Sequence, residues 1–323
     1  MSEVMPRLAS QSKEESSLNP NDRHMVWLES VAAEKRFGAR DKLGTANYID
    51  AAARRRAVEA MKTGTSFSLA RPLEVGNDEN YYHGSLKSEA IITPYDGLPH
   101  RPPFSGGPVA VATDVAHIAA HGQHQTHLDA LNHIGRHGKW YNGWAIDDPA
   151  GPDLTSLADH GLFTRGVLAD IPAVRGTEWV DEAKPVTGED IDSALAAAGV
   201  TFEPGDALLL YMGRDKYEAA GNEMDQSTGE PMPGAGSGAA RWLVEHQASM
   251  ICWDFIDAVA KGEPSFPVHM LIWATGLAVL DNTNYARVID SVRRSGVITG
   301  ALVVAPPPIP GATGSLVDPL FIQ

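Results

Sequence analysis

The 323-residue sequence is poor in cysteine, in long apolar runs and in basic residues. Its single cysteine, Cys252, excludes a disulfide within the chain and fits a reducing compartment. The longest apolar stretch, residues 268–280, is too short for a bilayer, which requires about 20 residues. Residues 1–22 are polar and have no apolar core of the kind found in secretory signals. These absences predict a cytoplasmic protein that has no membrane partner.

Acidic residues outnumber basic ones, 41 to 26, which gives a net charge of −15. Such a chain is repelled by phosphate backbones, and no basic run offsets the repulsion. We therefore expect no nucleic-acid partner. The sequence also contains no G-x-G-x-x-G, no Walker loop and no G-x-S-x-G, so nothing in it indicates a nucleotide cofactor or a serine nucleophile.

Strand-like and helix-like segments are intermixed along the chain, which is typical of the α/β class. Residues 1–24 are polar and predict a flexible N-terminal arm, whereas residues 25–323 contain no linker and predict a single domain with a mixed sheet. We expect strands at 65–73, 109–114, 166–171, 207–212, 250–254 and 297–305, and helices at 49–61, 190–198, 239–246 and 268–275.

Histidines gather in one short segment. Six of the twelve lie in HIAAHGQHQTHLDALNHIGRH, residues 117–137. If this segment is an extended strand up to Asp129, one face carries His117, His121, Gln123, Gln125, His127 and Asp129. Imidazole nitrogens beside a carboxylate are the donors of a divalent-metal site. A helical turn after Asp129 would bring His133 back over it at i+4.

The same segment resembles a known signature. Residues 126–133, Thr-His-Leu-Asp-Ala-Leu-Asn-His, are similar to the H-x-G-T-H-x-D-x-x-x-H motif of the metal-dependent cyclase/hydrolase family, which includes kynurenine formamidase and isatin hydrolase. The similarity extends to residues 37–47, 139–143, 205–210 and 311–315, as in the longer-chain members. The resemblance implies a swivelling β/β/α fold, a homodimer or higher homo-oligomer, and one or two divalent ions, zinc or manganese.

Carried over residue by residue, the resemblance assigns metal ligation to His127 and Asp129 and the last motif position to His133. The family's distal pair, a histidine and a glutamate twelve residues later, falls on His269 and Asp281. We therefore count both as candidate ligands.

The sequence departs from the motif at two positions. Gln123 stands where the family has its first histidine, and Gln125 replaces the motif glycine. Gln123 offers an amide oxygen, whereas His121 can substitute for the missing imidazole if a bulge shifts the strand. We expect one ion, held by His127, Asp129 and one of Gln123 or His121, with two ions as the alternative.

The predicted activity is hydrolysis of an amide or ester in a small, ring-containing substrate, either a cyclic lactam or lactone or an N-formyl amide. The ion would lower the pKa of a bound water to about 7, and His133 would act as general base. We expect Trp140 and Tyr141, in the loop after the motif, to bind substrate. The alternatives are a lactone hydrolase or cyclase reaction in the same site, and a catalytically inactive member that binds a small molecule.

Overall fold

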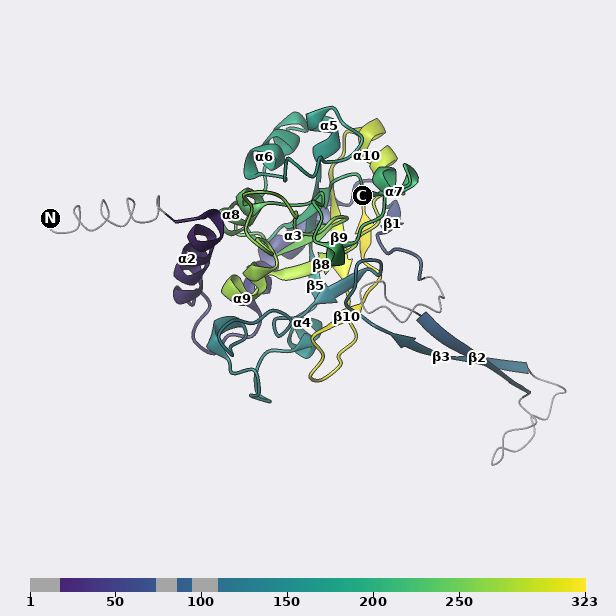
Figure 1. Cartoon of the computed structure of the whole chain (residues 1–323). Helices are drawn as coiled ribbons and strands as arrows, with labels where there is room; N and C mark the ends of the chain where they lie inside the picture. The colour runs from purple at the N-terminus through teal and green to yellow at the C-terminus, as the bar shows by residue number, and fades with distance from the viewer. Residues whose placement is uncertain (1–17, 74–85, 95–109) are drawn as a thin grey trace, which may run out of the picture.

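A nine-stranded mixed sheet forms the centre of the protein (Figure 1). The computed structural model describes residues 18–73, 86–94 and 110–323, with the backbone alone for 86–94 and 110–118. In sheet order the strands are β1 (Ser66–Ser68), β11 (Leu320–Ile322), β9 (Thr299–Val304), β5 (Leu162–Asp170), β6 (Ala207–Tyr211), β7 (Met250–Trp253), β8 (Ala278–Asp281), β4 (His127–Asp129) and β10 (Gly314–Leu316).

The middle of the sheet is parallel and its two sides are antiparallel. Strands β5, β6, β7 and β8 run parallel to one another, and β9 and β4 flank them in the antiparallel direction. The apolar runs ALLLY of β6 and MICW of β7 are buried along their whole length, as expected for strands covered on both faces. The core of the protein is therefore continuous around these strands.

Several helices begin at capping residues that the sequence provides. The α-helices are α2 (Pro20–Ala33), α3 (Ala51–Ala60), α4 (Leu154–His160), α5 (Ile171–Arg175), α6 (Gly188–Ala197), α7 (Arg214–Ala219), α8 (Ser237–Glu245), α9 (Met270–Thr275) and α10 (Ile289–Ser295). Thr187 and Asp190 form a capping box at the start of α6. The Asp50 carboxylate accepts from two N–H groups at the start of α3, which packs on β5 and β9.

One close backbone contact fixes the segment before α3. The 3-10 helix η1 (Gly44–Tyr48) meets the end of α9, where Thr45 N–H donates to Gly276 O at 3.0 Å. Gly44 has φ +56°, and a Cβ there would lie 2.1 Å from the carbonyl oxygen of Gly276. Both the backbone conformation and the approach require glycine at this position.

The predicted fold class, a single α/β domain with a mixed sheet, is confirmed. The predicted helix at 49–61 is α3, and the predicted strand at 207–212 is β6. The strand expected at 65–73 is shorter, since only Ser66–Ser68 pair with β11. Residues 1–17 of the expected arm lie outside the described residues, and its expected limit at residue 24 falls inside helix α2.

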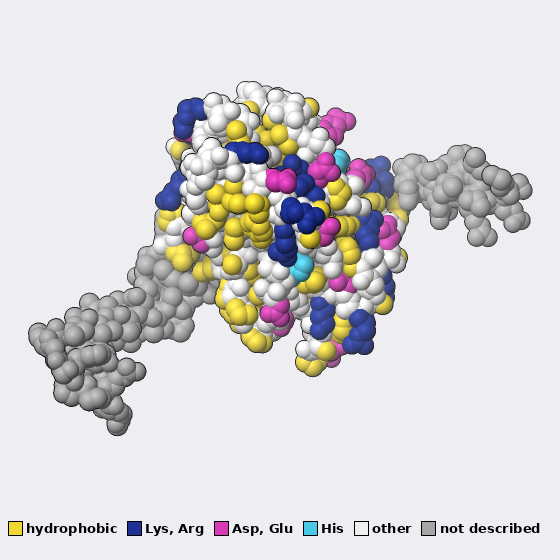
Figure 2. Space-filling model, turned by 180° about the vertical axis from the view of Figure 1, so that it is seen from behind, with side chains coloured by type: hydrophobic (Ala, Val, Ile, Leu, Met, Phe, Trp, Pro, Cys, Tyr) yellow, Lys and Arg dark blue, Asp and Glu magenta, His cyan; other side chains and the backbone are white. Residues whose placement is uncertain are grey.

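Strands β2 (Leu86–Pro94) and β3 (Ala110–Ile118) form a separate two-stranded ribbon that extends away from the main sheet (Figure 1). Figure 2 shows the body from behind, with side chains of both charge signs interspersed among hydrophobic ones. Among the helices of the described part, none combines the length and the apolar character needed to cross a bilayer.

Candidate metal centre

The histidine-rich segment is not one continuous strand. Strand β3 ends at Ile118, residues 119–126 form a bent loop, and β4 begins at His127. The expectation of period-two alternation from residue 117 to Asp129 is therefore wrong within the loop. It holds inside β4, where His127 and Asp129 share one side of the strand.

Strand β4 brings distant parts of the chain together because it lies between β8 and β10. Its register pairs His127 with Asp281 on one side and with Leu316 on the other. Strand β10 begins at Gly314, where a Cβ would lie 2.6 Å from Cε1 of His121. The absence of a side chain at Gly314 thus lets the His121 ring approach β10, where its Nε2 lies 2.9 Å from Thr313 Oγ1.

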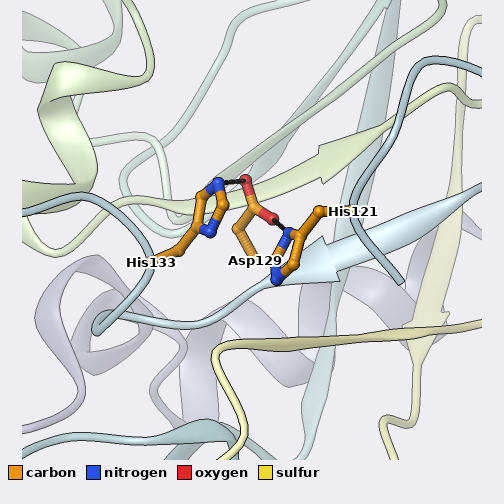
Figure 3. Close-up of side chains that lie close together, drawn as sticks. All are labelled: His121, Asp129 and His133. Atoms are coloured by element: carbon orange, nitrogen blue, oxygen red, sulfur yellow. Dashed lines mark ion pairs between the residues drawn. The ribbon is translucent and has the colours of Figure 1, made fainter. Parts of the chain in front are cut away.

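The Asp129 carboxylate is the centre of the cluster (Figure 3). It is fully buried, and within the described residues neither of its oxygens accepts a hydrogen bond. Its Oδ1 lies 3.0 Å from His121 Nδ1 and 3.5 Å from His127 Nε2. Its Oδ2 lies 3.8 Å from His133 Nε2 and 3.7 Å from His269 Nε2. Four imidazoles thus surround one carboxylate.

The distal pair predicted from the resemblance also lies in this cluster. Nε2 of His269, at the start of α9, lies 3.2 Å from Asp281 Oδ2 at the end of β8. His127 Nε2 is 3.7 Å from the same Asp281 oxygen. The other Asp281 oxygen accepts a hydrogen bond from the Trp253 indole N–H. One oxygen of Asp281 therefore remains directed at the histidines.

Two of the imidazoles are oriented by hydrogen bonds at their far nitrogens. His127 Nδ1 lies 2.8 Å from the carbonyl oxygen of Gln125, and His269 Nδ1 is hydrogen-bonded to the Asp257 carboxylate. In both rings Nε2 is left facing Asp129 and Asp281. Metal-binding histidines have this arrangement, because the outer partner fixes the tautomer and the direction of the ligating nitrogen.

Burial and neighbouring charges shift the pKa values in the cluster in opposite directions. Burial lowers the pKa of the His133 imidazole to about 4, although Asp129 opposes the shift, so His133 is neutral near pH 7. Burial would also lower the pKa of His269, but the carboxylates of Asp281 and Asp257 raise it well above its ordinary value. Burial would raise the pKa of Asp129, yet the surrounding imidazoles, His133 first, hold it below its ordinary value.

A cavity of about 590 Å³ opens directly over the cluster. His121, His127, His133, His269 and Asp281 line one side of it. Other lining residues come from the segment between β7 and α9 and are largely apolar; they include Ile256, Val259, Pro264 and the half-exposed Phe266. A cavity of this size accommodates a small organic molecule.

The two aromatic residues predicted to bind substrate lie elsewhere. Neither Trp140 nor Tyr141 lines the cavity over the cluster. Tyr141 is buried, and its hydroxyl donates to Asp41 at 2.9 Å, while the Trp140 indole N–H donates to Ile146 O. Their loop folds back toward residues 38–44 rather than over β4, so the structure does not support this expectation.

Of the two candidates for the missing imidazole position, His121 contacts Asp129 and Gln123 does not. The Gln123 side chain lines the cavity, but its Oε1 accepts a hydrogen bond from Gln226 N–H at 2.9 Å. Sequence reasoning missed Asp257 and Trp253, which orient His269 and Asp281. Their position at and just after the end of the buried strand β7 was an available signal, because parallel strands present functional groups at their carboxyl ends.

The fold and the site together define the class of protein. It is an α/β protein whose central sheet carries a buried His/Asp cluster that could hold a metal ion. Residues 34–258 match the family model described as "Putative cyclase", and the chain belongs to this cyclase family.

Several solved structures share this fold. A structure described as a novel cyclase superposes with a TM-score of 0.73 at 23% identity, covering 96% of this chain and 99% of that one. Isatin hydrolase A from Labrenzia aggregata, bound to benzyl benzoate, gives 0.56 at 19% identity, covering 83% and 99%. An isatin hydrolase bound to the product analogue thioisatinate gives 0.54 at 20% identity, covering 84% and 98%. The comparison with curated proteins gave no match.

Proposed function

We propose that this protein is a divalent-metal-dependent hydrolase that opens an amide or ester bond in a small, ring-containing molecule. The observation that carries the proposal is the Asp129 carboxylate, which is fully buried and surrounded by four imidazoles, the nearest being His121 at 3.0 Å, while no hydrogen bond of good geometry reaches it within the described residues. Removing a carboxylate from water without hydrogen bonds costs several kcal/mol unless a cation compensates for it. The donor set therefore fits a divalent ion.

The best-oriented ligands for a first ion are His127, His269, Asp129 and Asp281. Ligand atoms of His127, Asp129 and Asp281 lie within 4.8 Å of one another, and all three residues are buried. The His269 Nε2 atom lies between the two carboxylates. Mixed nitrogen and oxygen donors favour zinc or manganese over the oxygen-preferring ions magnesium and calcium.

A second group of ligands supports two ions as the alternative. Ligand atoms of His121, Asp129 and His133 also lie within 4.8 Å of one another. Both groups share Asp129, whose Oδ1 faces one imidazole of each group, His121 and His127. His121, rather than Gln123, supplies the imidazole on this side.

An ion in this cluster would supply a Lewis acid for a carbonyl oxygen and lower the pKa of water to about 7. The role that we propose for His133 is proton transfer. Its ring is neutral near pH 7, lines the cavity and is a quarter exposed, so Nε2 can accept a proton from water and return it to the leaving nitrogen or oxygen.

The shape and chemistry of the cavity support a ring-containing substrate. Ile256, Val259 and Pro264 form apolar walls, and Phe266 stands edge-on to His269 with ring centroids 6.0 Å apart. Flat apolar walls next to a polar reacting centre suit a molecule whose ring packs on one side and whose carbonyl faces the other. Two of the similar structures are isatin hydrolases with ring-containing molecules bound, which agrees with this proposal.

The first test is metal content, measured by mass spectrometry on protein purified without added metal. We expect one or two zinc or manganese ions per chain, lost in His127→Ala. The metal-loaded protein is then screened against formamides, cyclic imides, isatin-like lactams and lactones. Turnover of lactones alone would assign the lactone hydrolase reaction. Bound metal without turnover of any class would favour a small-molecule-binding protein, and protein that binds neither ion would refute the proposal.

Two further expectations from the sequence stay predictions. The resemblance implies a homodimer or higher homo-oligomer, which light scattering on the full chain tests directly. Cytoplasmic localisation, predicted from the lone cysteine and the polar N-terminus, is tested by cell fractionation.

A further inference from the structure

The loop at residues 119–126 contains no helix or strand, yet it carries His121 and leads into His127. In this loop His121 Nδ1 lies 3.0 Å from the buried Asp129 carboxylate. A segment without its own backbone hydrogen-bond ladder needs other partners to hold a side chain at that distance. The partners are Asn282, directly after β8, and Arg214, at the start of α7.

Asn282 holds the loop at two backbone carbonyls. Its Nδ2 donates to Gly122 O at 2.7 Å and to Gln125 O at 3.0 Å. Its own carbonyl accepts from the Thr126 hydroxyl at 2.7 Å. Asn282 has φ +55°, a left-handed conformation that asparagine tolerates, and it directly follows the candidate ligand Asp281. One residue thus links the loop to the other side of the cluster.

Arg214 binds the backbone carbonyl of Gln123, which lies between Gly122 and Gln125 in the loop. Its guanidinium is fully buried, and Nη2 donates to Gln123 O at 2.5 Å. Nη1 donates to Asn282 Oδ1 at 2.7 Å, which fixes the direction of that amide group. Nε donates to Glu218 Oε1 at 2.8 Å, so the buried charge has a carboxylate partner.

Burying a guanidinium group costs free energy, because its charge is removed from water. Replacing a buried ion pair with apolar side chains of similar volume is often neutral or stabilising, so stability alone does not account for Arg214. An apolar residue, by contrast, cannot donate hydrogen bonds to the backbone carbonyls of the loop and hold them in a fixed arrangement. Together, Arg214 and Asn282 bind those of Gly122, Gln123 and Gln125.

We propose that Arg214 and Asn282 are positioning residues, which fix the 122–125 loop and thereby place His121 beside Asp129. The inference rests on the proposed function, since it assigns the pair to an ion-binding cluster. It adds that metal affinity on the His121 side of the cluster, which includes Asp129 and His133, depends on two side chains that contribute no ligand atom.

The test removes the Asn282 side chain while keeping its backbone conformation. Asn282→Gly tolerates the positive φ but loses both hydrogen bonds to the loop. We expect zinc affinity, measured by competition with a chromophoric chelator, to fall about tenfold or more, as for other groups that orient ligands. The matched control is Asn142→Gly. Asn142 likewise has a positive φ, +61°, and its side chain donates to two backbone carbonyls, those of Gly38 and Asp41, but it lies away from the cluster.

A double-mutant cycle separates positioning from general destabilisation. If Asn282 acts through His121, then Asn282→Gly has no further effect on zinc affinity in a His121→Ala background. An equal loss of affinity in both backgrounds, or a loss matched by Asn142→Gly, would overturn the inference. Should Asn282→Gly lose its cooperative thermal transition, Arg214→Lys, which retains the charge but not the fork of donors, takes its place in the cycle.

The two proposals fail in different ways. Wild-type protein that binds neither zinc nor manganese refutes the proposed function, and this inference with it. Wild-type protein that binds zinc, combined with additive effects in the cycle, leaves the metal centre in place and refutes the positioning role alone.

Discussion

Asp257→Asn replaces one carboxylate oxygen with an amide group of nearly the same size, and the structure predicts a large effect on metal binding. In the wild type, Oδ1 accepts the Val268 N–H at 2.6 Å while Oδ2 accepts the proton on His269 Nδ1. Asp257 is almost fully buried, so water cannot take over either role. An asparagine that keeps its oxygen on Val268 must direct its NH2 group at His269.

That NH2 group donates rather than accepts, and so it favours the tautomer in which Nδ1 is unprotonated and the proton resides on Nε2. A protonated Nε2 cannot ligate a metal ion. Loss of groups that orient metal-binding histidines typically weakens affinity 10- to 100-fold, which corresponds to about 1.4–2.7 kcal/mol. We expect a loss within this range for zinc.

The assay is competition with a chromophoric chelator at pH 7, supported by thermal melting of the metal-free protein to show that the variant folds. Asp181→Asn is the control, since it makes the same chemical change at an exposed position, where the side chain accepts a hydrogen bond from Ala183 N–H. A dissociation constant for Asp257→Asn within twofold of the wild type would refute the tautomer argument.

Three further predictions concern catalysis and stability. His133→Ala should retain its metal but lose about 10²-fold or more in kcat, because it removes the proton acceptor, and unchanged turnover would exclude that role. Arg175 binds Asp190 at 2.6 Å and, although burial opposes it, holds the pKa of that carboxyl below its ordinary value. The stabilisation from this ion pair is therefore present above about pH 4 and lost as the pH falls through the lowered pKa of Asp190. Urea unfolding should show Asp190→Asn less stable than the wild type by about 1 kcal/mol at pH 7 and equal to it at low pH. Gly44→Ala should cost about 3 kcal/mol or more in the same assay, since its Cβ would lie 2.1 Å from Gly276 O, and a loss below about 1 kcal/mol would mean that the backbone relaxes there.

Local spacing in the sequence was enough to predict two members of the candidate centre, His127 and Asp129. His127 and Asp129 share a face because side chains alternate along any strand, however short. His121 was retained as a candidate by assuming a bulge that shifts the strand, whereas the structure brings it to Asp129 through a bent loop at 119–126 between two strands. His269 and Asp281 were identified only through the resemblance, because nothing in their local sequence relates them to residues 150 positions away.

What could not be predicted depends on the path of loops. Trp140 follows the motif closely in sequence, but its loop turns back on itself with a bridge between Arg136 and Lys139, so proximity in sequence was misleading. Asp257 and Asn282 carry no motif, and their importance comes from hydrogen bonds formed across strands. The fold class was more accessible, because buried runs such as residues 207–211 indicate central strands from composition alone.

The position of β4 in the sheet has a consequence for how the protein is made. Within the described residues this strand pairs with β8 and β10 alone. Their residues follow it by about 150 and 190 positions, so these neighbours do not exist when the ribosome first releases it. At about 5–20 residues per second, synthesis from residue 127 to residue 316 takes roughly 10–40 s. His269 and Asp281 are made only about 140–150 residues after the histidine-rich segment, and β10 follows them. The ligand set is thus complete only after residue 281 has been made, and a chain truncated before His269 retains the histidine-rich motif but lacks His269 and Asp281, half of the first-ion site.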